Sequence, residues 1–266
     1  MLGGASKNIL ELKTVQTNSF RTLIEALKEI LTDANIEFDE TGMKIRTMDG
    51  THTVFVHLKL NASDFDHYVC EEKYTIGVNM LNFFKLIKTM NNSDTLMLYI
   101  ESDCQEKLGI RIENGDKNSV TEYKLSLMDI NEEAVDVNDV DFDSVLTMPS
   151  ADFQKIIRDM NGIADIVDIK SYGKTIVFYC KGDFCTQLTR IGQNSTSGLS
   201  FSQVSNENQI VQGLFSLKYL FLFTKCTNLC NSIMICMKND FPIIILYKVG
   251  DLGDIKLCLA PRVNEM

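Results

Sequence analysis

Eight basic residues stand in four pairs along the chain, each within a segment that has the apolar spacing of a helix. The members of a pair are three or seven residues apart, so both project from one helix face. The pairs are Arg21 and Lys28, Lys85 and Lys88, Lys155 and Arg158, and Lys218 and Lys225. Such side chains can contact phosphate groups without reading a base sequence. The alternative is that each pair only solvates the exposed face of a surface helix.

Residues that could support catalysis form no recognisable motif. The sequence contains neither a glycine-rich nucleotide-binding motif nor a G-x-S-x-G nucleophile motif. Two of the three histidines, His52 and His57, are five residues apart on an expected strand and would point to opposite faces, so they would not share a metal ion. Four acids between positions 64 and 72 could serve a metal-dependent nuclease, although a solvated loop is the simpler interpretation. We therefore predict no enzymatic activity, no metal site and no cofactor.

The eight cysteines also lack the spacing of a metal site. No two of them are separated by two residues, and the pair Cys226 and Cys230 has no histidine nearby. Most lie within apolar runs, where a cysteine packs as a small hydrophobic residue. We expect reduced thiols in an intracellular protein, and no membrane partner, because no run of about twenty apolar residues occurs.

The charge of the chain is unevenly distributed. The formal net charge is −10, which taken alone would repel nucleic acid. The segment 128–144 holds seven acids and no basic residue, and its composition predicts a solvated connector. The expected helices around Lys85 and Lys218 contain no acid. The distribution therefore favours an acidic outer surface together with a basic face formed by helices.

The two halves of the chain repeat one order of elements. Apolar periodicity predicts helices over 20–31, 79–90, 150–160 and 215–226, with Ser150 as the N-cap of the third. Alternating patterns predict strands at 43–48, 54–60, a run ending at Cys70, 95–100, 108–112, 122–127, 144–148, 166–169, 175–180, 185–191, 232–238, 242–249 and 255–259. A polar loop is expected over 192–208. This order indicates an α+β fold with mostly antiparallel sheets, built from four similar β-α-β-β-β units. The domains expected are 1–128 and 145–266, joined by the connector 129–144.

Several segments, in order, resemble the proliferating cell nuclear antigen family. They are 48–52 (MDGTH) with the strand 54–60, 76–79 (IGVN), 123–129 (YKLSLMD), 148–150 (MPS), 217–225 (LKYLFLFTK) and 257–263 (LCLAPRV). The resemblance runs from about Leu12 to Val263, and the first ten residues look like an added extension. It implies the DNA-clamp fold: a homotrimeric, pseudo-sixfold ring with helices lining the hole and sheets outside. It also implies that the eight basic residues face duplex DNA, with Thr22 and Gly162 at positions that are often basic in the family. The alternative within this fold is a subunit of a heterotrimeric checkpoint clamp.

The same resemblance implies a groove beneath the connector for short partner peptides of the PIP-box type. The groove residues would be Met48, His52, Phe55, Val135, Val137, Phe142, Pro242, Leu259, Ala260 and Pro261. The alternative is that these residues only seal the connector onto the domain. Cys258 stands where family members often have a tyrosine, which would alter the choice of partner.

Subunit contacts in the family use the open edges of sheets. Carried over to this sequence, one edge would be Ser119, Val120, Thr121, Glu122, Tyr123 and Lys124, and the other Phe184, Cys185, Thr186, Gln187 and Leu188, with Met160 and Ile163 beside them. The resemblance further implies DNA polymerase, a clamp loader, flap endonuclease and DNA ligase as partners. It implies the nucleus as location, or a viral replication compartment if the chain is encoded by a virus.

Overall fold

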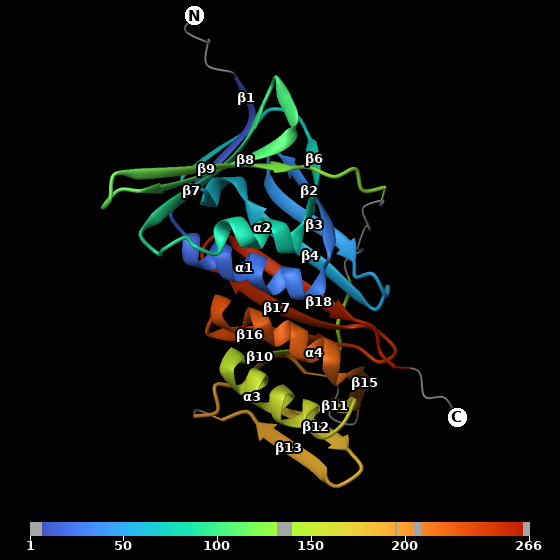
Figure 1. Ribbon diagram of the computed structural model, residues 1–266. Coiled ribbons are helices and arrows are strands. Elements are labelled where there is room, and N and C mark those ends of the chain that lie inside the picture. The colour runs from blue at the N-terminus through green and yellow to red at the C-terminus, as the bar shows by residue number, and fades with distance from the viewer. Residues whose placement is uncertain (1–6, 132–139, 195, 205–208, 263–266) are drawn as a thin grey trace, which may run out of the picture. The chain divides into compact units, whose positions relative to one another are not determined.

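A computed structural model describes residues 7–131, 140–194, 196–204 and 209–262 (Figure 1). The chain divides into two compact units, each of which includes short segments from the other half of the sequence. Unit 1 comprises Met1–Thr47, His57–Val135 and Val249–Asp254, and unit 2 comprises Met48–Val56, Asp136–Lys248 and Ile255–Met266.

Unit 1 combines two neighbouring helices with antiparallel strands. One sheet has the order β5 (His67–Cys70), β1 (Asn8–Thr14), β7 (Asp94–Glu101), β8 (Cys104–Asn114) and β9 (Ser119–Ser126). A second group has the order β4 (Val54–Asn61), β3 (Gly42–Met48), β2 (Asp33–Asp39) and β6 (Tyr74–Asn79), with the short 3-10 helix η1 (Ala62–Asp64) after β4. The helices are α1 (Thr17–Ile30) and α2 (Met80–Ile87). They meet through the edge-to-face contact of Phe20 and Phe83, whose ring centroids are 6.3 Å apart.

Unit 2 repeats this plan. One sheet has the order β13 (Thr186–Gly192), β12 (Thr175–Lys181), β11 (Ile166–Tyr172) and β15 (Val211–Ser216). A second group of strands has the order β14 (Ser200–Gln203), β10 (Ser144–Pro149), β16 (Ser232–Met237), β17 (Ile243–Val249) and β18 (Gly253–Leu259). The helices α3 (Ser150–Asn161) and α4 (Leu217–Phe223) contact each other, and α4 continues into the 3-10 helix η2 (Thr224–Leu229). The α+β fold expected from the sequence is confirmed.

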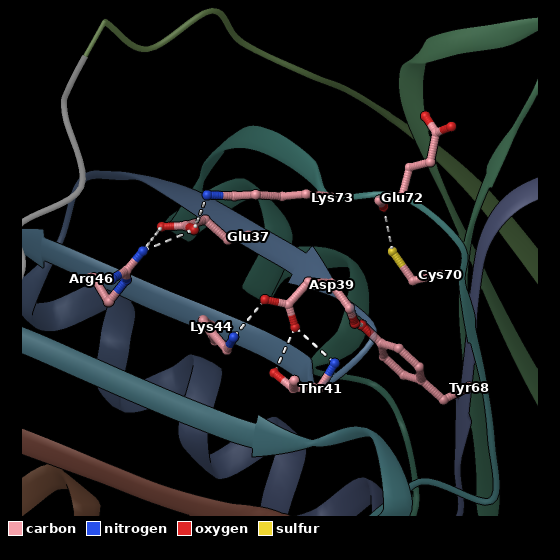
Figure 2. A network of polar contacts seen from close by, with 9 residues as sticks. All are labelled: Glu37, Asp39, Thr41, Lys44, Arg46, Tyr68, Cys70, Glu72 and Lys73. Atoms are coloured by element: carbon pink, nitrogen blue, oxygen red, sulfur yellow. Dashed lines mark hydrogen bonds and ion pairs between the residues drawn. The ribbon is translucent and has the colours of Figure 1, made fainter.

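A polar network, half-buried at Asp39 and Lys44, stabilises the β2–β3 hairpin of unit 1 (Figure 2). Asp39 accepts hydrogen bonds from the amide of Thr41 at 2.8 Å and from its hydroxyl at 2.6 Å, and it pairs with Lys44. Burial raises the pKa of Asp39, but these hydrogen bonds and the Lys44 ammonium outweigh burial and bring the pKa down to about 2. Glu37 pairs with Lys73 at 2.9 Å in the same network.

Four expectations at the element level are wrong. Asn8 to Leu10 belong to β1, and Leu10 is fully buried, so the first ten residues are not simply an added extension. The strand β14 lies inside the expected polar loop. Pro149 rather than Ser150 is the N-cap of α3, and the Ser150 hydroxyl instead donates to the carbonyl of Cys230 at 2.6 Å. His52 precedes β4 in a turn with φ of 55°, so it does not lie on the strand that carries His57.

Candidate nucleic-acid interface

The first two basic pairs come together on the neighbouring helices α1 and α2 of unit 1. Arg21 is half-buried on α1 and donates to the carbonyl of Met90 and, at 2.9 Å, to Oδ1 of Asn18. Lys28 is also half-buried, and its ammonium lies 4.9 Å from the ring centroid of Phe84 on α2 while it contacts Glu29. The remaining pair is exposed, with Lys85 on α2 and Lys88 at its C-cap. Two of these cations are therefore held against the protein and two extend into solvent.

The other two pairs lie on the neighbouring helices of unit 2 and are exposed. Lys155 and Arg158 project from α3, where Arg158 lies 3.7 Å from the carboxylate of Asp159. Lys218 is on α4 and Lys225 is on η2, because the regular helix ends at Phe223. Their ammonium groups lie 5.6 Å and 4.8 Å from the ring centroids of neighbouring aromatic residues.

The electrostatics of these helices suit an anionic ligand. Within the ranges that the structure describes, no carboxylate forms an ion pair with Lys85, Lys88, Lys155, Lys218 or Lys225. A charge that lacks an internal partner keeps its full attraction for a phosphate. In a chain of net charge −10, these five lysines are cations that the fold leaves available on helices.

Two of the four acids that could suggest a nuclease accept hydrogen bonds within the fold. Asp64 accepts a hydrogen bond from Asn61 at 2.7 Å, and Asp66 accepts one from the amide of Val15 at 2.8 Å. Among the described residues, no group of three or more His, Cys, Asp or Glu side chains could hold a metal ion. Within the described residues, no helix is long and apolar enough to cross a membrane.

Most of the expected groove residues lie in unit 2. Met48, Phe142, Pro242 and Pro261 are half-buried, His52 and Ala260 are exposed, and Phe55 and Leu259 are buried. The amide of Ala260 donates to the carbonyl of Thr53 at 3.2 Å, so the C-terminal strand end is tied to the turn that carries His52. Leu259 is completely buried, so its side chain is not part of the exposed surface. Val135 and Val137 fall outside the described residues.

One aromatic residue of this region was missed by the sequence reasoning. Phe241 packs edge-to-face on Phe142 with ring centroids 5.9 Å apart. Its position directly before Pro242 was the available signal. Cys258, which stands beside this surface, is half-buried, and burial raises the pKa of its thiol to about 12.

Each of the two segments expected at the subunit contact lies at least partly on a strand at the edge of its sheet. β9 ends the sheet of unit 1, where Val120 is 52% exposed, and β13 ends a sheet of unit 2, where Leu188 is 59% exposed. Phe184, just before β13, is 76% exposed. Met160 is completely buried, so the prediction that its side chain contributes to the subunit contact is wrong. Ile163 is half-buried. Its carbonyl oxygen lies so close to Gly182 that a Cβ added to that glycine would be only 2.0 Å from the oxygen.

A small hollow adjoins the β9 edge. It has a volume of about 150 Å³ and is lined in part by Thr89 after α2 and by Ser119, Thr121 and Tyr123 of β9. Its lining is mostly polar and also includes Asn91, Asp94, Asn114 and Lys117.

Comparison with known proteins assigns the family over almost the whole chain. The N-terminal domain of proliferating cell nuclear antigen matches residues 9–136, and its C-terminal domain matches residues 136–262. A relative described as "Probable DNA polymerase sliding clamp 1", from Paramecium bursaria Chlorella virus 1, is 34% identical over 261 residues, which are 96% of this chain and 98% of that relative. The chain therefore belongs to the proliferating cell nuclear antigen family of non-enzymatic DNA sliding clamps.

Proposed function

We propose that three copies of this chain close into a ring around duplex DNA and tether a DNA polymerase to its template. The observation that carries this proposal is the set of exposed lysines, without carboxylate partners, on the helix pairs of both units. These contacts are weak and blind to sequence, which sliding requires. The rest of the acidic chain faces away from the phosphates.

The work of such a ring is mechanical. A closed ring leaves a duplex only by sliding over a free end, so an enzyme bound to it stays at a high effective concentration near the primer end. The sequence contains no nucleotide-binding motif of its own. An ATP-driven clamp loader is therefore the class of partner that opens the ring.

The ring closes through edge strands. β9 of one copy pairs with β13 of the next, which gives both strands a hydrogen-bonding partner and covers the apolar side chains of Val120, Phe184 and Leu188. The hollow beside β9 receives a side chain from the neighbouring copy.

The surface that includes Met48, His52, Phe142 and Ala260 is the docking site for PIP-box-type peptides. An apolar groove accepts a short helical turn with two aromatic side chains. DNA polymerase, the clamp loader, flap endonuclease and DNA ligase are the partners proposed for it. Cys258 is smaller than a tyrosine, so the groove accepts a different range of anchoring side chains. These partners place the protein at the site of DNA replication, in the nucleus or in a viral replication compartment.

The salt dependence of DNA binding tests the basic helix faces. Each lysine that contacts a phosphate steepens the slope of log affinity against log salt concentration by about 0.9. Replacement of Lys85, Lys88, Lys218 and Lys225 by alanine is expected to flatten this slope on a linear duplex. The matched control replaces four lysines outside the helices, Lys59, Lys107, Lys174 and Lys256. Equal slopes for the two quadruple variants would refute the assignment.

A further inference from the structure

A hydrogen bond joins the helix α4 to the turn that precedes β4. The hydroxyl of Tyr219 on α4 lies 2.9 Å from Oγ1 of Thr51. The two residues are 168 positions apart in the sequence, and both belong to unit 2. The turn carries His52, and its two ends connect to Met48 at the end of β3 and to Val54 at the start of β4.

The turn is organised around one carboxylate. Asp49 is 6% exposed and accepts hydrogen bonds from the Thr51 hydroxyl at 2.5 Å, the Thr53 amide at 2.8 Å and the Val54 amide at 2.7 Å. Although burial raises the pKa of Asp49, these hydrogen bonds outweigh burial and hold the pKa below its ordinary value. The Thr51 side chain therefore links the centre of the turn to Tyr219.

The turn includes a backbone conformation that non-glycine residues adopt uncommonly. His52 has φ of 55°, in the left-handed region that side chains disfavour. The neighbouring carbonyl of Thr53 accepts the amide of Ala260 at 3.2 Å. The direction of the His52 side chain and the position of the Ala260 backbone thus both depend on the same few hydrogen bonds.

We propose that Tyr219 is a positioning residue for the partner-peptide groove: its hydroxyl holds Thr51, and through Thr51 it fixes the 49–53 turn that presents His52 and anchors Ala260. This inference rests on the proposed function of the groove. The tyrosine ring has a separate neighbour, since the Lys218 ammonium lies 5.6 Å from its centroid. Removal of the hydroxyl alone therefore leaves the phosphate-binding side of α4 intact.

The test compares variants that differ by one hydroxyl. The probe is a fluorescein-labelled synthetic PIP-box-type peptide with two adjacent aromatic residues, and the readout is its Kd by fluorescence anisotropy. Tyr219→Phe is expected to weaken binding about threefold to tenfold, because one hydrogen bond that orders the turn is lost. Thr51→Val should weaken it as well, Thr51→Ser should keep wild-type affinity, and the double variant Thr51→Val, Tyr219→Phe should be no weaker than Thr51→Val alone. The matched control is Tyr172→Phe, on β11 of the same unit, which should bind as the wild type does.

Hydrogen exchange gives a readout that does not depend on the peptide. In Tyr219→Phe, the amides of residues 51–54 should exchange faster, while the midpoint of thermal unfolding and the salt slope of DNA binding stay at wild-type values. Unchanged exchange in this segment, or unchanged peptide affinity in a wild type that does bind, would overturn the inference. If the wild type does not bind the peptide, the groove assignment fails, and the exchange result alone decides whether Tyr219 holds the turn.

Discussion

Truncation of Leu188 should weaken ring closure by an amount that follows from its exposure. Full burial of a leucine side chain contributes about 1.5–3 kcal/mol. Because 59% of Leu188 is exposed in the single chain, alanine removes about 1 kcal/mol from each contact that covers it. A ring of three copies makes this contact three times, so assembly loses about 3 kcal/mol. The protein concentration at which half of the chains are assembled varies with the square root of the trimer dissociation constant. This concentration should therefore rise about tenfold.

The assay is mass photometry or sedimentation velocity over a dilution series, which separates the 30.1 kDa chain from its trimer. The matched control is Ile210→Ala, which truncates a side chain of unit 2 that is 51% exposed but lies outside β9 and β13. The control should assemble at the wild-type concentration. An equal effect of the two variants, or a wild type that stays monomeric at every concentration, would refute the reasoning. A wild type that assembles only with different chains would favour a heterotrimeric clamp.

Two further predictions concern stability, measured by urea or thermal unfolding. The folded-state pKa of Asp39 is about 2, which lies below the ordinary value of about 3.9. The ionised form of Asp39 therefore stabilises the fold above about pH 4, and this contribution is lost as the pH falls towards 2. The Asp39→Asn variant should therefore be less stable than the wild type at neutral pH, and its free energy of unfolding should fall less between pH 4 and pH 2. The same dependence of stability on pH in variant and wild type would count against the pairing of Asp39 with Lys44. Gly109→Ala would place a Cβ 2.3 Å from the ring of Tyr99 and should destabilise the fold by about 1–3 kcal/mol, whereas Gly115→Ala, with open space around it, should be neutral.

Helices were the most predictable part of the fold. Phe20, Leu23, Ile24 and Leu27 recur with helical spacing, and all four are buried on α1. The strand β14 was missed because its short polar sequence, Ser200 to Gln203, lacks the alternation that marks a half-buried strand.

The site was predictable as a set of residues but not as a set of contacts. Helical spacing placed Met160 on an apolar face, but such spacing does not distinguish a core side chain from one that meets another subunit. The contacts of Lys28 with Phe84 and of Tyr219 with Thr51 join distant segments, so no local pattern carries the information. The helices follow from local spacing, whereas these contacts depend on how distant segments pack.

The measurement that tests the central claim most directly compares two topological forms of one plasmid. A closed ring can thread onto a linear duplex over its free ends, whereas a covalently closed circle offers no end. At equal DNA mass and low salt, without a clamp loader, the protein is first incubated with the DNA, and streptavidin is then bound to both biotin-labelled ends of the linear form so that threaded rings cannot slide off. The protein should then co-elute in gel filtration with the linear form and not with the closed circle. Blocking both ends of the linear form with bound streptavidin before the protein is added should abolish co-elution. Equal binding to the closed circle would contradict encirclement.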